Sequence, residues 1–219
     1  MNPPADPASP VALFAGSRLC CRRGGRDVFD GIGFALRSGD ALALTGPNGS
    51  GKSSLLRVMA GLLPPVAGAL YWQGAPVADD PEAHRARLAY LGHLDAVKPA
   101  LGVAENLRFW IDFAGGDAAS RDAALARFDL QYLAELPARY LSAGQRRRLA
   151  LARVVCVPRP LWLLDEPSTG LDYRSIAALE AVIAAHRASG GIVVVSTHAA
   201  LDLAGAMHLD LGAQSERAA

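Results

Sequence analysis

The sequence predicts an α/β fold with a mixed or parallel sheet at its core, an N-terminal antiparallel β subdomain and an inserted helical subdomain. Three observations lead to this prediction. A glycine-rich loop at residues 46–53 stands between an apolar run and a helical pattern. A second apolar run, at 161–164, ends in two acidic residues, as buried strands do where α/β folds place their chemistry. Between these two segments the pattern turns helical, over about 99–156.

The chain divides into one predicted domain flanked by two tails. Residues 1–10, MNPPADPASP, lack the basic and apolar regions of a signal peptide and are predicted to be a disordered tail. Residues 11–212 are expected to fold as a single domain, with the helical subdomain at about 95–156 inside it. Residues 213–219 are predicted to be a second disordered tail. With 219 residues, of which 51% are hydrophobic, the chain is long enough to bury a sizeable core.

The expected elements follow from the spacing of apolar residues. Short apolar runs alternate with turn residues over about 11–45, as in an antiparallel sheet, and the run Ala69–Trp72 is expected to join that sheet. The expected helices are Val103–Phe113, Ala123–Tyr132, the segment after Ser142 and a helix that begins near Tyr173. The expected later strands are Leu161–Leu164, Ile192–Val195 and Met207–Leu211.

The glycine-rich loop has the composition of a phosphate cradle. It consists of Gly46, Pro47, Asn48, Gly49, Ser50, Gly51, Lys52 and Ser53. Its glycines let consecutive backbone N–H groups point at α- and β-phosphates. Lys52 is expected to reach the β- and γ-phosphates, and the Ser53 hydroxyl to bind Mg²⁺. Only two of the 22 basic residues, Lys52 and Lys98, are lysines, which favours a specific use of the compact ammonium at Lys52.

The acidic pair Asp165-Glu166 follows the apolar run at 161–164. Asp165 is expected to hold Mg²⁺, directly or through water, and Glu166 to orient and polarise the attacking water. Taken alone, such a pair could equally precede a helix. A turn at 168–172 comes next, and later the run Ile192–Val195 leads to His198, which could donate to a γ-phosphate or be an ordinary core histidine.

The segment Leu141–Val154, LSAGQRRRLALARV, is the most informative of the chain. Ser142 is a good helix N-cap, yet Gly144 in the first turn costs about 1 kcal/mol relative to alanine. Arg146, Arg147 and Arg148 crowd the helix end at which the dipole disfavours cations. An anion that binds at this helix start would explain both features, because the glycine lets it reach the backbone N–H groups and the arginines supply countercharge. For the arginines alone, an ordinary exposed helix start is the simpler interpretation.

Taken in order, these motifs resemble the ATP-binding cassette family, over residues from about 46 to 198. GPNGSGKS resembles its Walker A motif and LWLLDE its Walker B motif, with Glu166 as the catalytic glutamate. The signature motif is matched by Leu141, Ser142, Ala143, Gly144 and Gln145, the D-loop by STGLD with Ser168 and Asp172, and the switch histidine by His198. The resemblance implies an ATPase of the ABC type that uses ATP and Mg²⁺. It also implies a head-to-tail homodimer, in which the signature of one chain closes over ATP held by the other.

Two positions depart from the family pattern. No glutamine occurs between Pro76 and Leu130, where the family carries one that links the γ-phosphate and Mg²⁺ to the membrane partner. His93, in YLGHL, is the expected stand-in because its ring can both donate and accept hydrogen bonds. The N-terminal aromatic residue on which adenine stacks is also missing, and an arginine plane, Arg23, is expected to replace it.

The segment Tyr90–Trp110, YLGHLDAVKPALGVAENLRFW, resembles more narrowly the haem-exporter-type ATPases of cytochrome c maturation. That resemblance implies membrane-spanning permease subunits (CcmB-type, with a CcmC-type partner) and a peripheral location on the cytoplasmic face of the bacterial inner membrane. Trp110 and Phe113 are expected to pack internally or to meet a helix of the membrane subunit. The main rival is the ATPase subunit of another small ABC exporter for a drug, lipid or ion.

Composition and missing motifs argue against other classes. The net charge of +1 gives no basic footprint for nucleic acid, and no apolar run of about 18 residues predicts a membrane span. Three cysteines, two of them adjacent, suggest no disulfide framework, and the lack of a partner cluster argues against a metal or haem site at Cys20-Cys21. A GTPase would need an NKxD motif, which is absent. A soluble, non-transport cassette protein would usually carry a second cassette or a long coiled-coil insert, and neither is visible in the sequence. A purely ATP-binding module would lack Glu166.

Overall fold

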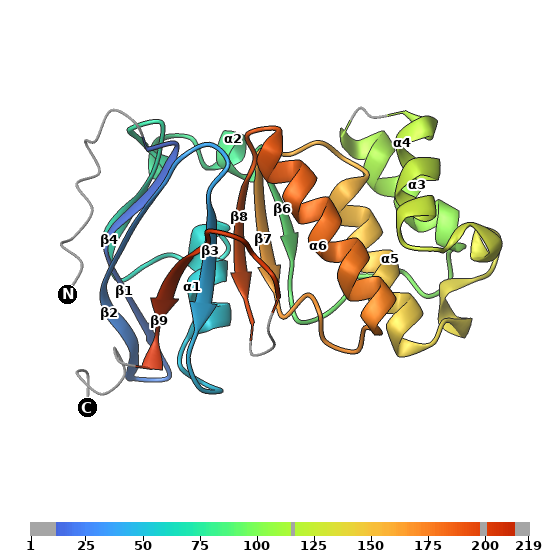
Figure 1. The fold of residues 1–219 in the computed structure, drawn as a ribbon. Coiled ribbons are helices and arrows are strands. Elements are labelled where there is room, and N and C mark those ends of the chain that lie inside the picture. Colours follow the sequence, from blue (N-terminus) through green and yellow to red (C-terminus); the bar gives the residue numbers. More distant parts are fainter. Residues whose placement is uncertain (1–11, 115–116, 198–200, 213–219) are drawn as a thin grey trace. The chain divides into compact units, whose positions relative to one another are not determined.

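The structure, a computed structural model, describes residues 12–114, 117–197 and 201–212 (Figure 1). Both predicted tails and His198 therefore lie outside the described residues. The chain forms two compact units. Of the described residues, the first unit comprises 12–90, 159–165, 186–197 and 201–212, and the second comprises 91–114, 117–158 and 166–185.

An antiparallel sheet makes up one layer of the first unit. Its strands are β1 (Phe14–Arg23), β2 (Arg26–Leu36), β4 (Ala67–Trp72) and β5 (Ala75–Pro76), in the order β2-β1-β4-β5. Strands β1 and β2 are joined by the two residues Gly24 and Gly25, both at positive φ, as the twist of a tight hairpin requires. The predicted antiparallel subdomain and its turn are thus confirmed.

A second sheet contains the strand that precedes the phosphate loop, together with four later strands. It consists of β6 (Leu88–Leu91), β7 (Leu161–Asp165), β8 (Ile192–Ser196), β3 (Ala41–Thr45) and β9 (Met207–Asp210), in the order β6-β7-β8-β3-β9. Strand β3 pairs in parallel with β8 and β9, and β7 pairs in parallel with β8. The expectation that the antiparallel pattern continues to residue 45 was wrong, because β3 belongs to this second sheet.

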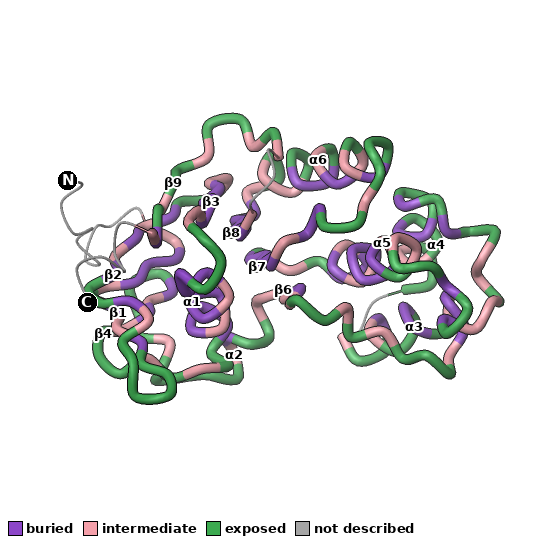
Figure 2. Tube along the Cα trace, turned by 90° about the horizontal axis from the view of Figure 1, so that it is seen from below, coloured by how far each residue is buried: buried purple, intermediate pink, exposed green. Residues whose placement is uncertain are grey.

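Helix α1 (Lys52–Met59) joins both sheets through one core. The cluster of buried side chains contains residues from β1, β2 and β4 as well as from α1, β3, β7 and β8. In Figure 2, α1 lies between the antiparallel sheet and the second sheet, and most of its residues are buried. This packing fixes the start of α1, and with it the phosphate loop, against the carboxyl end of β3. Helix α2 (Pro81–Ala86) and a 3₁₀ turn at Val77–Asp79 follow β5.

The second unit is helical. It contains α3 (Val103–Ala114), α4 (Ala118–Arg127), α5 (Ala143–Val155) and the start of α6 (Tyr173–Ala188), with 3₁₀ turns at Gln131–Leu133 and Ala138–Tyr140. Helix α4 begins and ends about five residues earlier than the predicted Ala123–Tyr132. Its physical bounds are the Asp117 side chain, which caps the first turn, and Asp129, which takes a left-handed conformation just after the helix.

Candidate functional site

The phosphate loop is held closed around its lysine. Gly51 precedes α1 at φ 101°, and a Cβ there would lie 2.6 Å from Val28 Cγ1, so both the conformation and the space require glycine. The Lys52 ammonium donates to the backbone carbonyls of Gly46 at 2.8 Å and Pro47 at 3.0 Å. A nearly buried lysine at a helix N-terminus, directly after a glycine-rich loop, is suited to anionic phosphate.

The loop is linked directly to the edge of β7. Ser53 Oγ, in the first turn of α1, donates to Asp165 Oδ1 at 3.0 Å. Ser196 Oγ donates to the same oxygen at 2.6 Å, because the register of β7 and β8 places Ser196 beside Asp165. Asp165 is 1% exposed. A hydroxyl and a carboxylate at this distance are the hard oxygen ligands that Mg²⁺ prefers, and the residues therefore fit that ion.

No group of three or more His, Cys, Asp or Glu side chains gathers as a metal site in the part of the chain that the structure describes. Two protein oxygen ligands suit an ion that arrives with the phosphates of a nucleotide rather than a resident metal. Ser196 was not predicted as a site residue. The available signal was its place as the last residue of an apolar strand that runs beside β7.

Glu166 directly follows β7 in an unusual conformation. Its φ is 48°, in the left-handed region that non-glycine residues rarely adopt. Two groups hold its backbone carbonyl: the Thr169 N–H at 3.2 Å, and Arg147 Nη2 at 2.6 Å. Strained backbone of this kind persists only where the surroundings determine it, and it clusters at functional sites.

The signature segment starts α5 with a complete capping box. Ser142 Oγ accepts from the Gln145 N–H, and Gln145 Oε1 accepts from the Ser142 N–H. Ser142 and Ala143 are exposed while Leu141 is buried. A Cβ on Gly144 would lie 3.1 Å from the Gly170 carbonyl oxygen, so a larger residue would crowd the turn after Glu166. The start of α5 is thus exposed at Ser142 and Ala143, while the Ser142 and Gln145 N–H groups are bonded within the capping box.

The three arginines after the signature make contacts within the second unit, and Arg147 is buried rather than exposed at the helix start. A countercharge role for Arg146 and Arg148 stays a prediction. Arg146 donates to the Leu141 carbonyl, and Arg148 to the Phe128 carbonyl. Arg147 is 6% exposed and lies inside the second unit. The helical period places it one turn before the buried Leu151, a signal that the sequence offered.

The turn after Glu166 leads into α6. Ser168 is buried, and Asp172 caps the helix by accepting from the Ser175 N–H at 2.8 Å. The side-chain and backbone hydrogen bonds from Ser175 lower the pKa of Asp172. In this structure Asp172 therefore acts as a helix cap, in addition to any role across a dimer.

The two expected substitutes for missing family residues lie in different units. Arg23 is exposed at the end of β1, beside the Gly24-Gly25 turn. His93 is exposed in the segment after β6, next to Leu94, which is 81% exposed. Within this segment, the acidic residue Asp95 pairs with Arg147 at 2.8 Å. Sequence reasoning missed Asp95.

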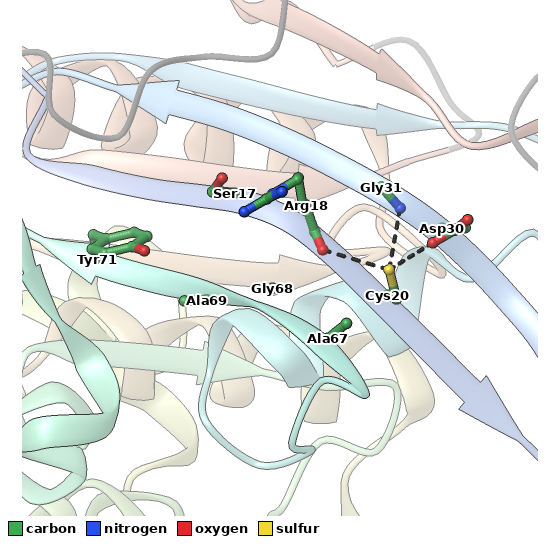
Figure 3. A pocket seen from close by; sticks show the side chains of 9 residues that line it. All are labelled: Ser17, Arg18, Cys20, Asp30, Gly31, Ala67, Gly68, Ala69 and Tyr71. Carbon is green, nitrogen blue, oxygen red and sulfur yellow. Dashed lines mark hydrogen bonds between the residues drawn. The ribbon is translucent and has the colours of Figure 1, made fainter.

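The adjacent cysteines point to opposite faces of β1, as the two-residue period of a strand requires. Cys21 lies in the core, and Cys20 lines a hollow of about 480 Å³ on the antiparallel sheet (Figure 3). The Cys20 thiol donates to Asp30 Oδ1 at 2.6 Å, and this hydrogen bond, with burial, raises its pKa. The thiol therefore stays protonated, and the two sulfurs do not converge on a metal or haem.

The aromatic residues of α3 differ in exposure. Trp110 is half-buried, with the Arg153 guanidinium 4.9 Å from its ring centroid. Phe113 is 79% exposed. Internal packing thus explains Trp110, whereas Phe113 leaves an apolar side chain on the surface. Of the helices in the described ranges, none is both long and apolar enough to cross a membrane.

Comparison with known proteins decides the family. Residues 29–169 match the ABC transporter family. The chain belongs to the ATP-binding cassette (ABC) family. This ABC ATPase is 59% identical over 211 residues, 94% of its length and 97% of the relative's, to a "Cytochrome c biogenesis ATP-binding export protein CcmA" from Paramagnetospirillum magneticum. It is 57% identical to a protein of the same name from Rhodospirillum rubrum, over 91% of this chain and 86% of that one.

Solved structures agree on the fold of this ABC ATPase. An ATP-binding subunit of an ABC transporter matches with a TM-score of 0.78 at 28% identity, covering 85% of this chain and 79% of that one. A putative ABC transporter ATP-binding protein from Pyrococcus furiosus matches with a TM-score of 0.80 at 22% identity, over 92% and 98% of the two chains. The predicted fold class and the predicted ATPase activity are both confirmed.

Proposed function

We propose that this chain is the ATP-hydrolysing subunit of a membrane complex that powers haem export, or release of a haem chaperone, in c-type cytochrome maturation. The observation that carries the proposal is the Ser53–Asp165 hydrogen bond, because it joins the phosphate loop to the acidic edge of β7 in the way that Mg²⁺-dependent phosphoryl transfer needs. The haem role is supported by relatives that are more than half identical and carry the name of cytochrome c biogenesis export proteins.

The residues would divide the hydrolysis of ATP to ADP and phosphate among them. Lys52 and the amides of its loop hold the phosphates, and Ser53 and Asp165 hold Mg²⁺. When bound, Mg²⁺ neutralises charge on the phosphate oxygens. Glu166 accepts a proton from the attacking water, and its carboxylate orients that water. His198 donates a hydrogen bond to the γ-phosphate, and Arg23 stacks on the base.

A second chain would complete each site. Ser142 and Gly144 of one protomer would close over ATP held by Lys52 of its partner, in a head-to-tail homodimer. The exposure of Ser142 and Ala143 at the start of α5 supports this arrangement, because a helix N-terminus at the surface favours an anion. Membrane-spanning permease subunits of the CcmB and CcmC types would be the partners, with the ATPase on the cytoplasmic face of the inner membrane. His93 would take the place of the coupling glutamine.

The test is a haem-stained gel of membranes from cells whose only copy of the chain carries Glu166→Gln. We expect loss of covalently haem-bearing cytochromes while the protein remains present at its wild-type level. Glu135→Gln is the matched control, since it makes the same chemical change at an exposed position in the second unit. Normal haem staining in Glu166→Gln cells would refute the cytochrome role and favour another ABC exporter.

A further inference from the structure

Arg147 connects three segments of the second unit from inside the protein. Its Nη2 donates to the Glu166 carbonyl at 2.6 Å, and its Nε to the Pro167 carbonyl at 3.4 Å. Its Nη1 donates to Asp95 Oδ1 at 2.8 Å and to the Gly92 carbonyl at 3.4 Å. One guanidinium thus spans helix α5, the turn after β7 and the segment after β6.

The planar fork of arginine is needed for this arrangement. Its donors point in fixed directions and reach the two segments at the same time, whereas lysine offers a single point charge on a flexible stem. Asp95 supplies the negative charge that a nearly buried guanidinium requires, and its own side chain is 22% exposed. The carboxylate therefore fixes where the fork lies.

The two ends of this connection hold Glu166, the proposed base, and His93, the proposed substitute for the coupling glutamine. At one end is the backbone of Glu166, held at φ 48°. At the other end is the segment Gly92–Asp95, which has no glutamine and exposes His93 and Leu94 at the surface. A displacement of that segment would move Asp95, and the same guanidinium would pass the displacement on to the Glu166 carbonyl.

We propose that Arg147, held by Asp95, is a positioning residue that sets the backbone of Glu166 and couples it to the segment Gly92–Asp95. This inference rests on the proposed role of Glu166 as the base. The ion pair does not touch ATP. It determines whether the Glu166 carboxylate meets the attacking water in the productive orientation.

The test compares ATP hydrolysis by the full chain, purified from cells that express its membrane subunits, for Asp95→Asn and Arg147→Lys. We expect kcat to fall about 10–100-fold in both variants, since misplacement of a reacting group by about 1 Å has effects of that size. The KM for ATP should change by less than about threefold, because the loss falls on the chemical step. Arg147→Lys keeps the buried positive charge, so it preserves a folded protein should Asp95→Asn unfold.

Asp129→Asn is the matched control. Asp129 lies 3.9 Å from Arg148, the next residue of α5, and 3.9 Å from Arg174 of α6. Asparagine also tolerates the left-handed conformation at this position. We expect wild-type kcat in this control. An equal fall of kcat in Asp129→Asn and Asp95→Asn would refute the proposal, because any loss of an ion pair to α5 would then have the same effect.

Glu166→Gln is measured in parallel to separate the two hypotheses. Wild-type hydrolysis by Glu166→Gln would refute the proposed function itself. An inactive Glu166→Gln with unchanged kcat per folded molecule in Asp95→Asn and Arg147→Lys would refute only the positioning role. In the double variant Asp95→Asn/Glu166→Gln, we expect the residual rate to match that of Glu166→Gln alone, since both changes act through the same carboxylate.

Discussion

At the scale of single residues, a buried histidine makes stability depend on pH. His84 is fully buried, its Nε2 lies 2.8 Å from the Met59 carbonyl oxygen, and its ring stacks on Phe14. Burial lowers the pKa of His84 below its ordinary value of 6.5. The unfolded chain therefore binds a proton more readily than the folded one, so the free energy of unfolding falls as the pH drops below about 6.5.

We expect His84→Gln to flatten this dependence between pH 7.5 and 5.5, because the glutamine amide can donate to Met59 without titrating. Urea unfolding at several pH values measures the slope. His186 is the matched position, since burial also lowers the pKa of its imidazole, which stacks on Trp162 at 3.9 Å. When both His84 and His186 are replaced by glutamine, the free energy of unfolding should depend less on pH than in either single variant. A wild-type slope in His84→Gln would show that His84 does not carry the effect.

At the scale of elements, the antiparallel sheet depends on a close approach of β1 and β4. Gly68, in β4, has φ 84°, and a Cβ there would collide with the backbone carbonyl of Arg18 in β1. Gly74, between β4 and β5, has nearly the same φ, 81°, but open space around it. The two glycines thus separate the cost of conformation from the cost of collision.

We expect Gly68→Ala to destabilise the protein by about 3 kcal/mol or more, the sum of left-handed strain and overpacking. Gly74→Ala should cost only about 1–2 kcal/mol, since strain alone applies. Chemical denaturation of both variants gives the comparison. Equal losses would mean that β1 and β4 separate to make room, and that their close approach is not required.

The secondary-structure elements also differ in how well the sequence predicted them. Strands β3, β7 and β8 were predictable because each is a short apolar run that ends at polar or glycine residues, and Gly24-Gly25 marked its hairpin. The position of α4 was not, because its bounds depend on the Asp117 cap and on the conformation of Asp129. The contacts of Arg147 with Asp95 and Glu166 join segments far apart in the chain, and only the folded structure brings them together.

At the scale of the whole molecule, the proposed head-to-tail dimer can be tested by mixing two defective chains. Lys52→Ala removes the phosphate contact of a chain, and Gly144→Asp places a negative charge at its signature. In a head-to-tail dimer of the two, one site combines the intact loop of one chain with the intact signature of the other. If each chain built its site alone, no mixture would contain an intact site.

The mixture is prepared in a Glu166→Gln background, so that bound ATP is retained rather than hydrolysed. We expect an ATP-containing dimer on size-exclusion chromatography only when the two variants are mixed, at about one nucleotide per mixed dimer. Thermal denaturation of each variant checks that both chains are folded, because Gly144 lies close to the Gly170 carbonyl oxygen. Absence of ATP from the mixed dimer, with Glu166→Gln alone retaining it, would rule out the exchange of signatures between protomers. Retention would place Lys52 and Gly144 of different chains on the same nucleotide.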